Sequence, residues 1–255
     1  MDVNFGKTSS DYGRHRAGFP DELFERLAHF GIGRQGQRLL DLGTGTGTLA
    51  RGFARRDCRV MALDPAGAQL REARRLDAAS KSKIRYLVAR AEAVPLPDAG
   101  FDVVTAGQCW HWFDGRAVAA EARRLLAPNG TLVIAHFDWL PLPGNVVEAT
   151  ERLIESHNPA WHFGGGLGMY PRWTRELAAA GFVGIETFSF DLHVRYSHES
   201  WRGRIRASAG VGASLAPNHV AEFDQELTRL LETRREPDPL QIPHRVFAVL
   251  AHKPA

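Results

Sequence analysis

The feature that most constrains the fold is a glycine-rich turn that follows a short apolar segment. Residues 39–47 read Leu-Leu-Asp-Leu-Gly-Thr-Gly-Thr-Gly, and a helical pattern begins at Thr48. Glycine permits the positive φ of a tight turn and lets a ligand approach the backbone closely. The N–H groups that begin the next helix can donate to a polar or negative ligand group. The stretch therefore predicts a strand, a ligand-binding loop and a helix in succession.

An acidic residue ends the next apolar segment. Asp64 lies 21 residues after Gly43, at the tip of the second predicted strand. A carboxylate at this position can accept hydrogen bonds from ribose hydroxyls. Dinucleotide-binding loops read GxGxxG, whereas this loop reads GxGxG and has Thr48 where the third glycine of that fingerprint would fall. The loop and Asp64 together favour a nucleoside cofactor other than a dinucleotide.

The remaining sequence alternates short apolar runs with helical stretches, which is typical of a parallel α/β sheet. Strands are predicted at residues 38–42, 59–64, 84–89, 101–106, 131–135, 183–190 and 246–251. Helices are predicted at residues 21–30, 48–55, 66–78, 116–126, 172–180 and within 197–235. The turn at residues 128–130 should separate a helix from the fifth strand, and residues 141–170, rich in proline and glycine, should form loops and insertions.

The whole chain, residues 1–255, is predicted to be one domain, near the upper end of the usual size for one. Residues 1–37 should form an N-terminal cover and residues 38–140 the cofactor-binding core. Residues 141–235 should hold a substrate-side insertion and the sixth strand, and residues 236–255 the last strand.

These motifs resemble class I S-adenosylmethionine-dependent methyltransferases, and among them the methyltransferase type 11 subgroup. Asp64 matches the ribose-binding acid of that family, and the resemblance runs in order from about Tyr12 to Ile134. The segments that carry it are residues 40–47, 62–65, 91–98 and 101–104. The resemblance implies a Rossmann-like fold: a seven-stranded, mostly parallel sheet with helices on both faces, an antiparallel C-terminal strand and helical additions over the active site.

The resemblance also implies roles for individual residues. Asp41 would order the loop or meet the methionine amino group of the cofactor through water, and Asp64 would bind the ribose. Many family members carry an acid just before the Ala91-Glu92 pair, whereas this chain has Arg90, so Glu92 is the candidate for the adenine amino group. The cofactor-binding candidates are Asp41, Gly43, Thr44, Gly45, Asp64, Pro65, Ala91, Glu92, Gln108, Tyr12 and Arg16.

A histidine between two tryptophans follows the fourth predicted strand. Residues 108–113 read Gln-Cys-Trp-His-Trp-Phe, and ligands of open α/β sheets bind beyond the carboxyl ends of the strands. His111 is a candidate general base, because its ordinary pKa lies near neutrality; the alternative is a structural histidine. Trp112 is a candidate substrate contact. The segment resembles family members with a His-Trp-Phe run, including those similar to trans-aconitate methyltransferases.

Three arginines near the predicted acceptor side suggest an anionic substrate. Arg202, Arg204 and Arg206 follow Trp201, and on a helix Arg202 and Arg206 would share a face while Arg204 points elsewhere. Arginine holds a carboxylate through two parallel hydrogen bonds. Arg204 is therefore the candidate for substrate binding, and a solvated charged face is the alternative.

Composition narrows the remaining possibilities. The net charge of +3 is spread in short groups along the chain, so a nucleic-acid partner is not expected. The two cysteines have no CxxC spacing, the histidines match no metal site, and no apolar run approaches a membrane span. We expect a cytoplasmic monomer or homodimer that moves a methyl group from S-adenosylmethionine to a small-molecule acceptor, with a carboxylate or a hydroxyl as the acceptor group. The alternatives are a non-catalytic S-adenosylmethionine sensor, an RNA or protein methyltransferase, and a nicotinamide dehydrogenase.

Overall fold

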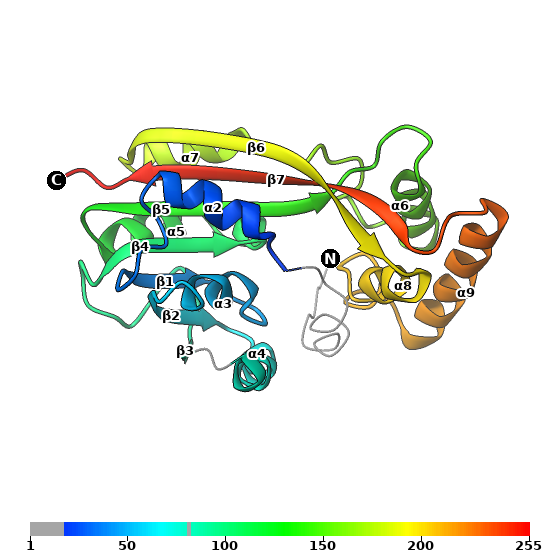
Figure 1. Cartoon of the computed structure of the whole chain (residues 1–255), viewed down its shortest axis with the longest axis horizontal. Coiled ribbons are helices and arrows are strands. Elements are labelled where there is room, and N and C mark those ends of the chain that lie inside the picture. The colour runs from blue at the N-terminus through cyan, green and yellow to red at the C-terminus, as the bar shows by residue number, and fades with distance from the viewer. Residues whose placement is uncertain (1–17, 81–82) are drawn as a thin grey trace. The chain divides into compact units, whose positions relative to one another are not determined.

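Seven strands form one sheet in the computed structural model, which describes residues 18–80 and 83–255 (Figure 1). The strand order is β3-β2-β1-β4-β5-β7-β6, and the number of strands is the one that the resemblance implied. The strands are β1 Arg38–Leu42, β2 Arg59–Asp64, β3 Ile84–Val88, β4 Phe101–Gly107, β5 Leu126–Trp139, β6 Val183–Tyr196 and β7 Leu240–His252. The first five are parallel. β7 is antiparallel and lies between β5 and β6.

The register of the parallel strands sets where a ligand can be held. Leu42, the last residue of β1, pairs with Leu63 on β2 and with Ala106 on β4. The carboxyl ends of these strands therefore meet at one edge of the sheet, which we call the carboxyl edge. Four of the five residues of β1 are buried, as expected for a strand covered on both faces. The glycine loop and Asp64 both lie at this edge.

Helices cover both faces of the parallel part of the sheet. In Figure 1, α2 (Asp21–His29) and α3 (Thr48–Ala54) lie in front of the strands, and α5 (Gly115–Leu125) and α7 (Arg172–Ala179) lie behind them. α4 (Gly67–Ser80) packs against β2 and β3. Asp114 caps α5 by accepting from the backbone N–H groups of Arg116 and Ala117, which satisfies donors that a helix start leaves unpaired.

Three strands are longer than their apolar runs predicted. β5 begins at Leu126, directly after α5, so the prediction that residues 128–130 separate helix from strand was wrong. Those residues form an irregularity within the strand, where Asn129 has a φ of 61° and the register with β4 shifts between Phe101 and Val103. β6 continues to Tyr196 and β7 begins at Leu240. Their outer parts alternate between more and less exposed residues and carry too few consecutive apolar residues to be recognised.

The chain divides into two compact units. Residues 18–137, 170–189 and 246–255 belong to the unit with the glycine loop. Residues 138–169 and 190–245 belong to the other, which we call the α6–α9 unit. It contains α6 (Val146–His157), α8 (His198–Arg206) and α9 (Pro217–Thr233), packed around a core that includes Trp201, Phe223 and Leu227.

Helix α6 contradicts a second prediction, because it lies within residues 141–170, which were predicted to form loops and insertions. Asn145 caps the helix by accepting a hydrogen bond from Glu148 N. Its buried residues Val146, Val147, Thr150 and Ile154 repeat at helical spacing. The prolines on both sides of the segment concealed this periodicity.

Candidate active site

Each glycine of the loop adopts the left-handed backbone conformation. The φ angles are 58° at Gly43, 55° at Gly45 and 79° at Gly47, where a side chain would be strained. A Cβ on Gly43 would lie 2.8 Å from the Phe113 ring, so the loop packs closely on the segment that follows β4. A Cβ on Gly45 would meet no described atom within 4 Å. The loop is therefore packed on one side and open at Gly45.

Asp64 joins the glycine loop to the turn after β2. Its Oδ2 accepts a hydrogen bond from Gly45 N at 2.9 Å and its Oδ1 accepts one from Ala66 N at 2.8 Å. The residue is 9% exposed, and burial raises the pKa of its carboxyl. Each carboxylate oxygen has a second lone pair. Asp64 can therefore hold the loop in place and still accept hydrogen bonds from ligand hydroxyls.

Asp41 lies beneath the loop, and both of its oxygens are engaged by hydroxyl groups. Oδ2 accepts from Thr44 Oγ1 at 2.6 Å, and Oδ1 accepts from Thr105 Oγ1 at 2.7 Å. The residue is 1% exposed. Of the two predicted roles, this geometry favours ordering the loop. Thr44, a predicted cofactor contact, is buried in the same network.

The buried Asp41 carboxyl should make stability depend on pH. Burial raises its pKa from 3.8 to about 6, so between pH 4 and 6 the folded chain binds this proton more tightly than the unfolded chain. Ionisation as the pH rises through this window therefore destabilises the fold. From pH 4.5 to pH 7 the expected cost is about 2 kcal/mol. Urea unfolding at both pH values should show that the free energy of unfolding falls by about 2 kcal/mol less in Asp41→Asn than in the wild type over this interval. An equal fall in both proteins would contradict the raised pKa of Asp41.

The predicted adenine-side residues lie beyond the ends of β2 and β3. Pro65 is exposed and Ala91 is buried. Glu92 is half-buried and forms an ion pair with Arg90, whose Nε lies 3.4 Å from Glu92 Oε2. The arginine that departs from the family pattern thus neutralises the neighbouring acid. Sequence reasoning missed Val88, which pairs with Asp64 in the register and is 60% exposed, an apolar surface suited to a flat base.

Gln108 turns the chain from β4 toward the histidine segment. It has a φ of 61°, and its backbone N–H donates to Ala135 O at 2.9 Å. Its side-chain Nε2 donates to Phe137 O. The amide nitrogen is thereby engaged by β5, so a ligand amino group would be met by the amide oxygen.

His111 lies in an aromatic cluster at the carboxyl edge. It belongs to a short 3₁₀ turn, Trp110–Trp112, and its ring centre lies 4.7 Å from that of Trp112 and 5.1 Å from that of His136. Trp110 is buried and its Nε1 donates to Glu176 Oε2 at 2.9 Å, so it is a core residue. Trp112 is 40% exposed and remains the candidate for contact with a ligand.

His136 is a second histidine in this cluster, which sequence reasoning did not single out. It is 1% exposed, and its ring lies 4.6 Å from Tyr170 and 4.9 Å from Trp173, measured between ring centres. Its neighbour Ala135 pairs with Gly107, the last residue of β4. The signal that could have identified it is its position directly after the predicted fifth strand, at the edge where ligands bind.

The remaining predicted residues are not part of this cluster. Tyr12 and Arg16 lie outside the described residues. Arg204 belongs to the α6–α9 unit, where its guanidinium carbon lies 4.6 Å from the ring centre of Trp139. Arg202 and Arg206 both bind Asp224. The prediction that Arg204 points away from the other two arginines is confirmed.

The described residues, 18–80 and 83–255, bear on two further possibilities, a metal centre and a membrane span. No group of three or more His, Cys, Asp or Glu side chains there could hold a metal ion. None of the described helices combines the length and apolar character that crossing a lipid bilayer requires.

Part of the sequence matches a known family model and curated proteins. Residues 40–134 match a family model described as a methyltransferase domain. An uncharacterized methyltransferase from Mycobacterium tuberculosis is 34% identical over 132 residues, which cover 52% of this chain and 51% of the relative. The match thus spans about half the length of such curated relatives.

Two solved structures share the fold. One, described as a type II methyltransferase from Anaeromyxobacter dehalogenans, has a TM-score of 0.64 at 24% identity and covers 94% of this chain and 98% of its own. The other is a phosphoethanolamine N-methyltransferase from Haemonchus contortus in complex with S-adenosyl-L-methionine. It has a TM-score of 0.59 at 20% identity and covers 100% of this chain and 58% of its own.

Proposed function

We propose that the chain, whose residues 40–134 match a methyltransferase domain model, transfers a methyl group from S-adenosylmethionine to a small, carboxylate-bearing acceptor. The observation that carries the cofactor assignment is Asp64, whose two oxygens accept from Gly45 N and Ala66 N. This bond pair places a buried carboxylate beside a loop that is open at Gly45.

The residues at the carboxyl edge fit this cofactor. Gly45 leaves room for close approach to the backbone, and Asp64 offers lone pairs to ribose hydroxyls. Val88 and Pro65 offer exposed surface beside Asp64 for the adenine. When bound, S-adenosylmethionine supplies a methyl group on a positively charged sulfur and leaves as S-adenosylhomocysteine. The exposed Trp112 can favour that positive charge through its aromatic face.

Arg204 supports a carboxylate acceptor. Arg202 and Arg206 are neutralised by Asp224, whereas Arg204 interacts with Asp138 and with the Tyr196 hydroxyl. It is half-buried over Trp139, and burial lowers the pKa of its guanidinium. A partly desolvated cation gains from an anionic partner more than an exposed one does. The planar guanidinium suits a carboxylate, which it can bind through two hydrogen bonds.

The role of His111 depends on the atom that is methylated. An ionised carboxylate oxygen is already nucleophilic, so alignment with the methyl group would provide most of the acceleration. A hydroxyl oxygen must lose its proton, and His111 at the carboxyl edge would accept it. His136 would then fix the orientation of the His111 ring, since the ring centres lie 5.1 Å apart.

Calorimetric titration with S-adenosylmethionine and S-adenosylhomocysteine tests the cofactor assignment. We expect micromolar binding by the wild type and at least tenfold weaker binding by Asp64→Ala, about 1.4 kcal/mol. Asp21→Ala removes an exposed carboxylate that pairs with Arg56, and it should leave the affinity unchanged. Circular dichroism would verify that each variant is folded. Absence of heat with either ligand would overturn the proposal.

Transfer of a labelled methyl group tests the acceptor class. Label should enter small carboxylates such as trans-aconitate, citrate or succinate. Label in RNA or in bulk protein instead would favour a macromolecular acceptor. Tight cofactor binding with no transfer to any of these would favour the non-catalytic sensor.

A further inference from the structure

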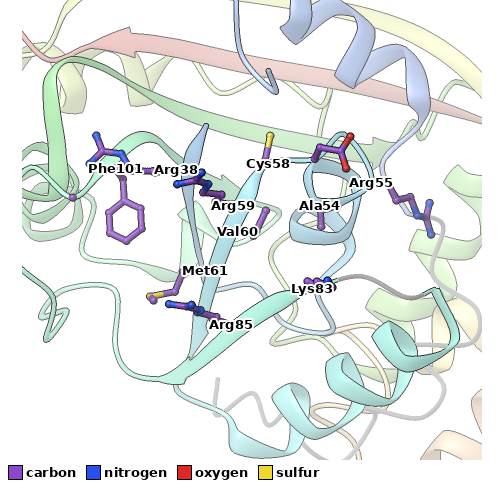
Figure 2. Close-up of a pocket in the computed structure, with 12 residues that line it drawn as sticks. Arg38, Ala54, Arg55, Cys58, Arg59, Val60, Met61, Lys83, Arg85 and Phe101 are labelled. Atoms are coloured by element: carbon purple, nitrogen blue, oxygen red, sulfur yellow. The ribbon is translucent and has the colours of Figure 1, made fainter. Parts of the chain in front are cut away.

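A cationic pocket lies at the amino-terminal edge of the parallel strands, opposite the carboxyl edge (Figure 2). Its volume is about 890 Å³, within the range of small-molecule sites. Its walls come from the starts of β1, β2, β3 and β4 and from the turn after α3. We call it the amino-edge pocket and define it by Arg38, Arg55, Arg59, Lys83, Arg85 and Phe101.

The strand register gathers three of these cations on one face of the sheet. Arg38 pairs with Arg59 across β1 and β2, and Met61 pairs with Arg85 across β2 and β3. Side chains two residues apart on a strand point to the same face, so Arg59 and Met61 share a face. Arg38, Arg59 and Arg85 therefore project from the same side of three adjacent strands, as Figure 2 shows.

The pocket carries an excess of positive charge that the described protein does not neutralise. Asp57 is the one acidic residue in its lining. Arg38 is paired with Asp102 at 2.6 Å. Arg55, Arg59, Lys83 and Arg85 form no ion pair with any residue that the structure describes. The whole chain has a net charge of only +3, so this concentration of unneutralised cations is local.

The chemistry of the pocket matches a multiply charged phosphate ligand. Arginine guanidinium groups bind phosphate oxygens through two hydrogen bonds, and several arginines can share the oxygens of linked phosphates. Met61 and Phe101 add apolar surface beside the cations. We infer that the amino-edge pocket binds a small ligand that carries a diphosphate group, separately from the cofactor.

The position of the pocket makes this binding independent of the proposed methyl transfer. β1 has five residues, which span about 16 Å. A ligand held at Arg38 and Arg59 would therefore not contact the glycine loop at the other end of the strand. The diphosphate ligand and S-adenosylmethionine should bind without competing directly.

Calorimetric titration of the full chain with sodium diphosphate and with ADP, in 150 mM sodium chloride, tests this inference. We expect measurable binding of both, and an affinity at least tenfold lower in the double variant Arg59→Gln/Arg85→Gln. Tighter binding of ADP than of diphosphate would indicate that Met61 and Phe101 contact the nucleoside. The matched control is Arg116→Gln/Arg123→Gln, which removes two exposed charges from α5. This control should change the affinity less than twofold.

Three outcomes would overturn the inference: equal losses in both double variants, equal binding of sulfate at the same ionic strength, or tighter binding of a single-stranded oligonucleotide than of ADP. The affinity of Arg59→Gln/Arg85→Gln for S-adenosylmethionine provides a separate readout. It should match the wild type, which would show that the fold is intact. If the wild type binds diphosphate but no S-adenosylmethionine, the proposed function fails and this inference stands.

Discussion

Replacement of Trp173 by alanine is expected to lower the free energy of unfolding by about 3–5 kcal/mol. The side chain is fully buried. Its ring stacks on Tyr170 with 4.1 Å between ring centres, and the rings of His136 and Phe247 lie at 4.9 and 6.1 Å. Alanine would leave a large cavity among rigid rings that cannot collapse to fill it. The melting temperature should fall by about 6–20 °C.

Phenylalanine at the same position provides the matched comparison. The Trp173 indole N–H has no hydrogen-bond partner among the described residues, so Trp173→Phe removes volume without breaking a hydrogen bond. We expect it to cost about 1–2 kcal/mol. Trp112→Ala, on an exposed ring, should cost less than 1 kcal/mol. Urea unfolding of the three variants measures these differences, and a similar loss for Trp173→Ala and Trp173→Phe would contradict the cavity argument.

The same stack connects stability to the candidate active site. Tyr170 and Trp173 contact His136, and the His136 ring lies beside that of His111. The orientation of His111 therefore depends on a core that is assembled from β5, α7 and Tyr170, which lies two residues before α7. A variant that loosens the stack should disturb the orientation of His111 before it disturbs the glycine loop.

Local chemistry made the cofactor loop predictable from the sequence. Gly43, Gly45 and Gly47 each need a positive φ, and Asp64 needs only to follow an apolar run at the right distance. These requirements act over a few residues. Strands β1, β2 and β4 were predictable for a similar reason, because each is a short and mostly buried apolar run.

The parts that escaped prediction depend on contacts between distant segments. The bond from Thr105 to Asp41 exists because β4 pairs with β1. His136 joins His111 because β5 lies beside β4. The sequence analysis interpreted the positive charge as short groups spread along the chain. The linear order does not show that the starts of four strands meet, so the concentration of charge in the amino-edge pocket was not predicted. Sequence periodicity predicts helices and strands, whereas the order of the strands in the sheet decides which of their ends become neighbours.

For the acceptor, we expect Arg204→Gln to lower kcat/KM for a small carboxylate at least 100-fold, mainly through a higher KM. Loss of one partner of a desolvated, hydrogen-bonded charge pair costs about 2–5 kcal/mol. A 100-fold change corresponds to about 2.7 kcal/mol, and most of that range lies above this value. The affinity for S-adenosylmethionine should not change. Arg204→Lys keeps the charge but not the planar fork, so it should recover only part of the activity.

Arg206→Gln separates a specific role of Arg204 from the loss of any positive charge on α8. Arg206 lies one helical turn from Arg202 and pairs with Asp224 and Glu199, so its charge is already neutralised within the protein. Its removal should change kcat/KM less than threefold. The most discriminating substrate is the uncharged amide analogue of the best carboxylate acceptor. The wild type should strongly prefer the carboxylate, and Arg204→Gln should abolish that preference while Arg206→Gln retains it. Equal effects of the two glutamine variants would show that Arg204 contributes only to the general charge of the helix, and the carboxylate assignment would then fail even if methyl transfer itself were demonstrated.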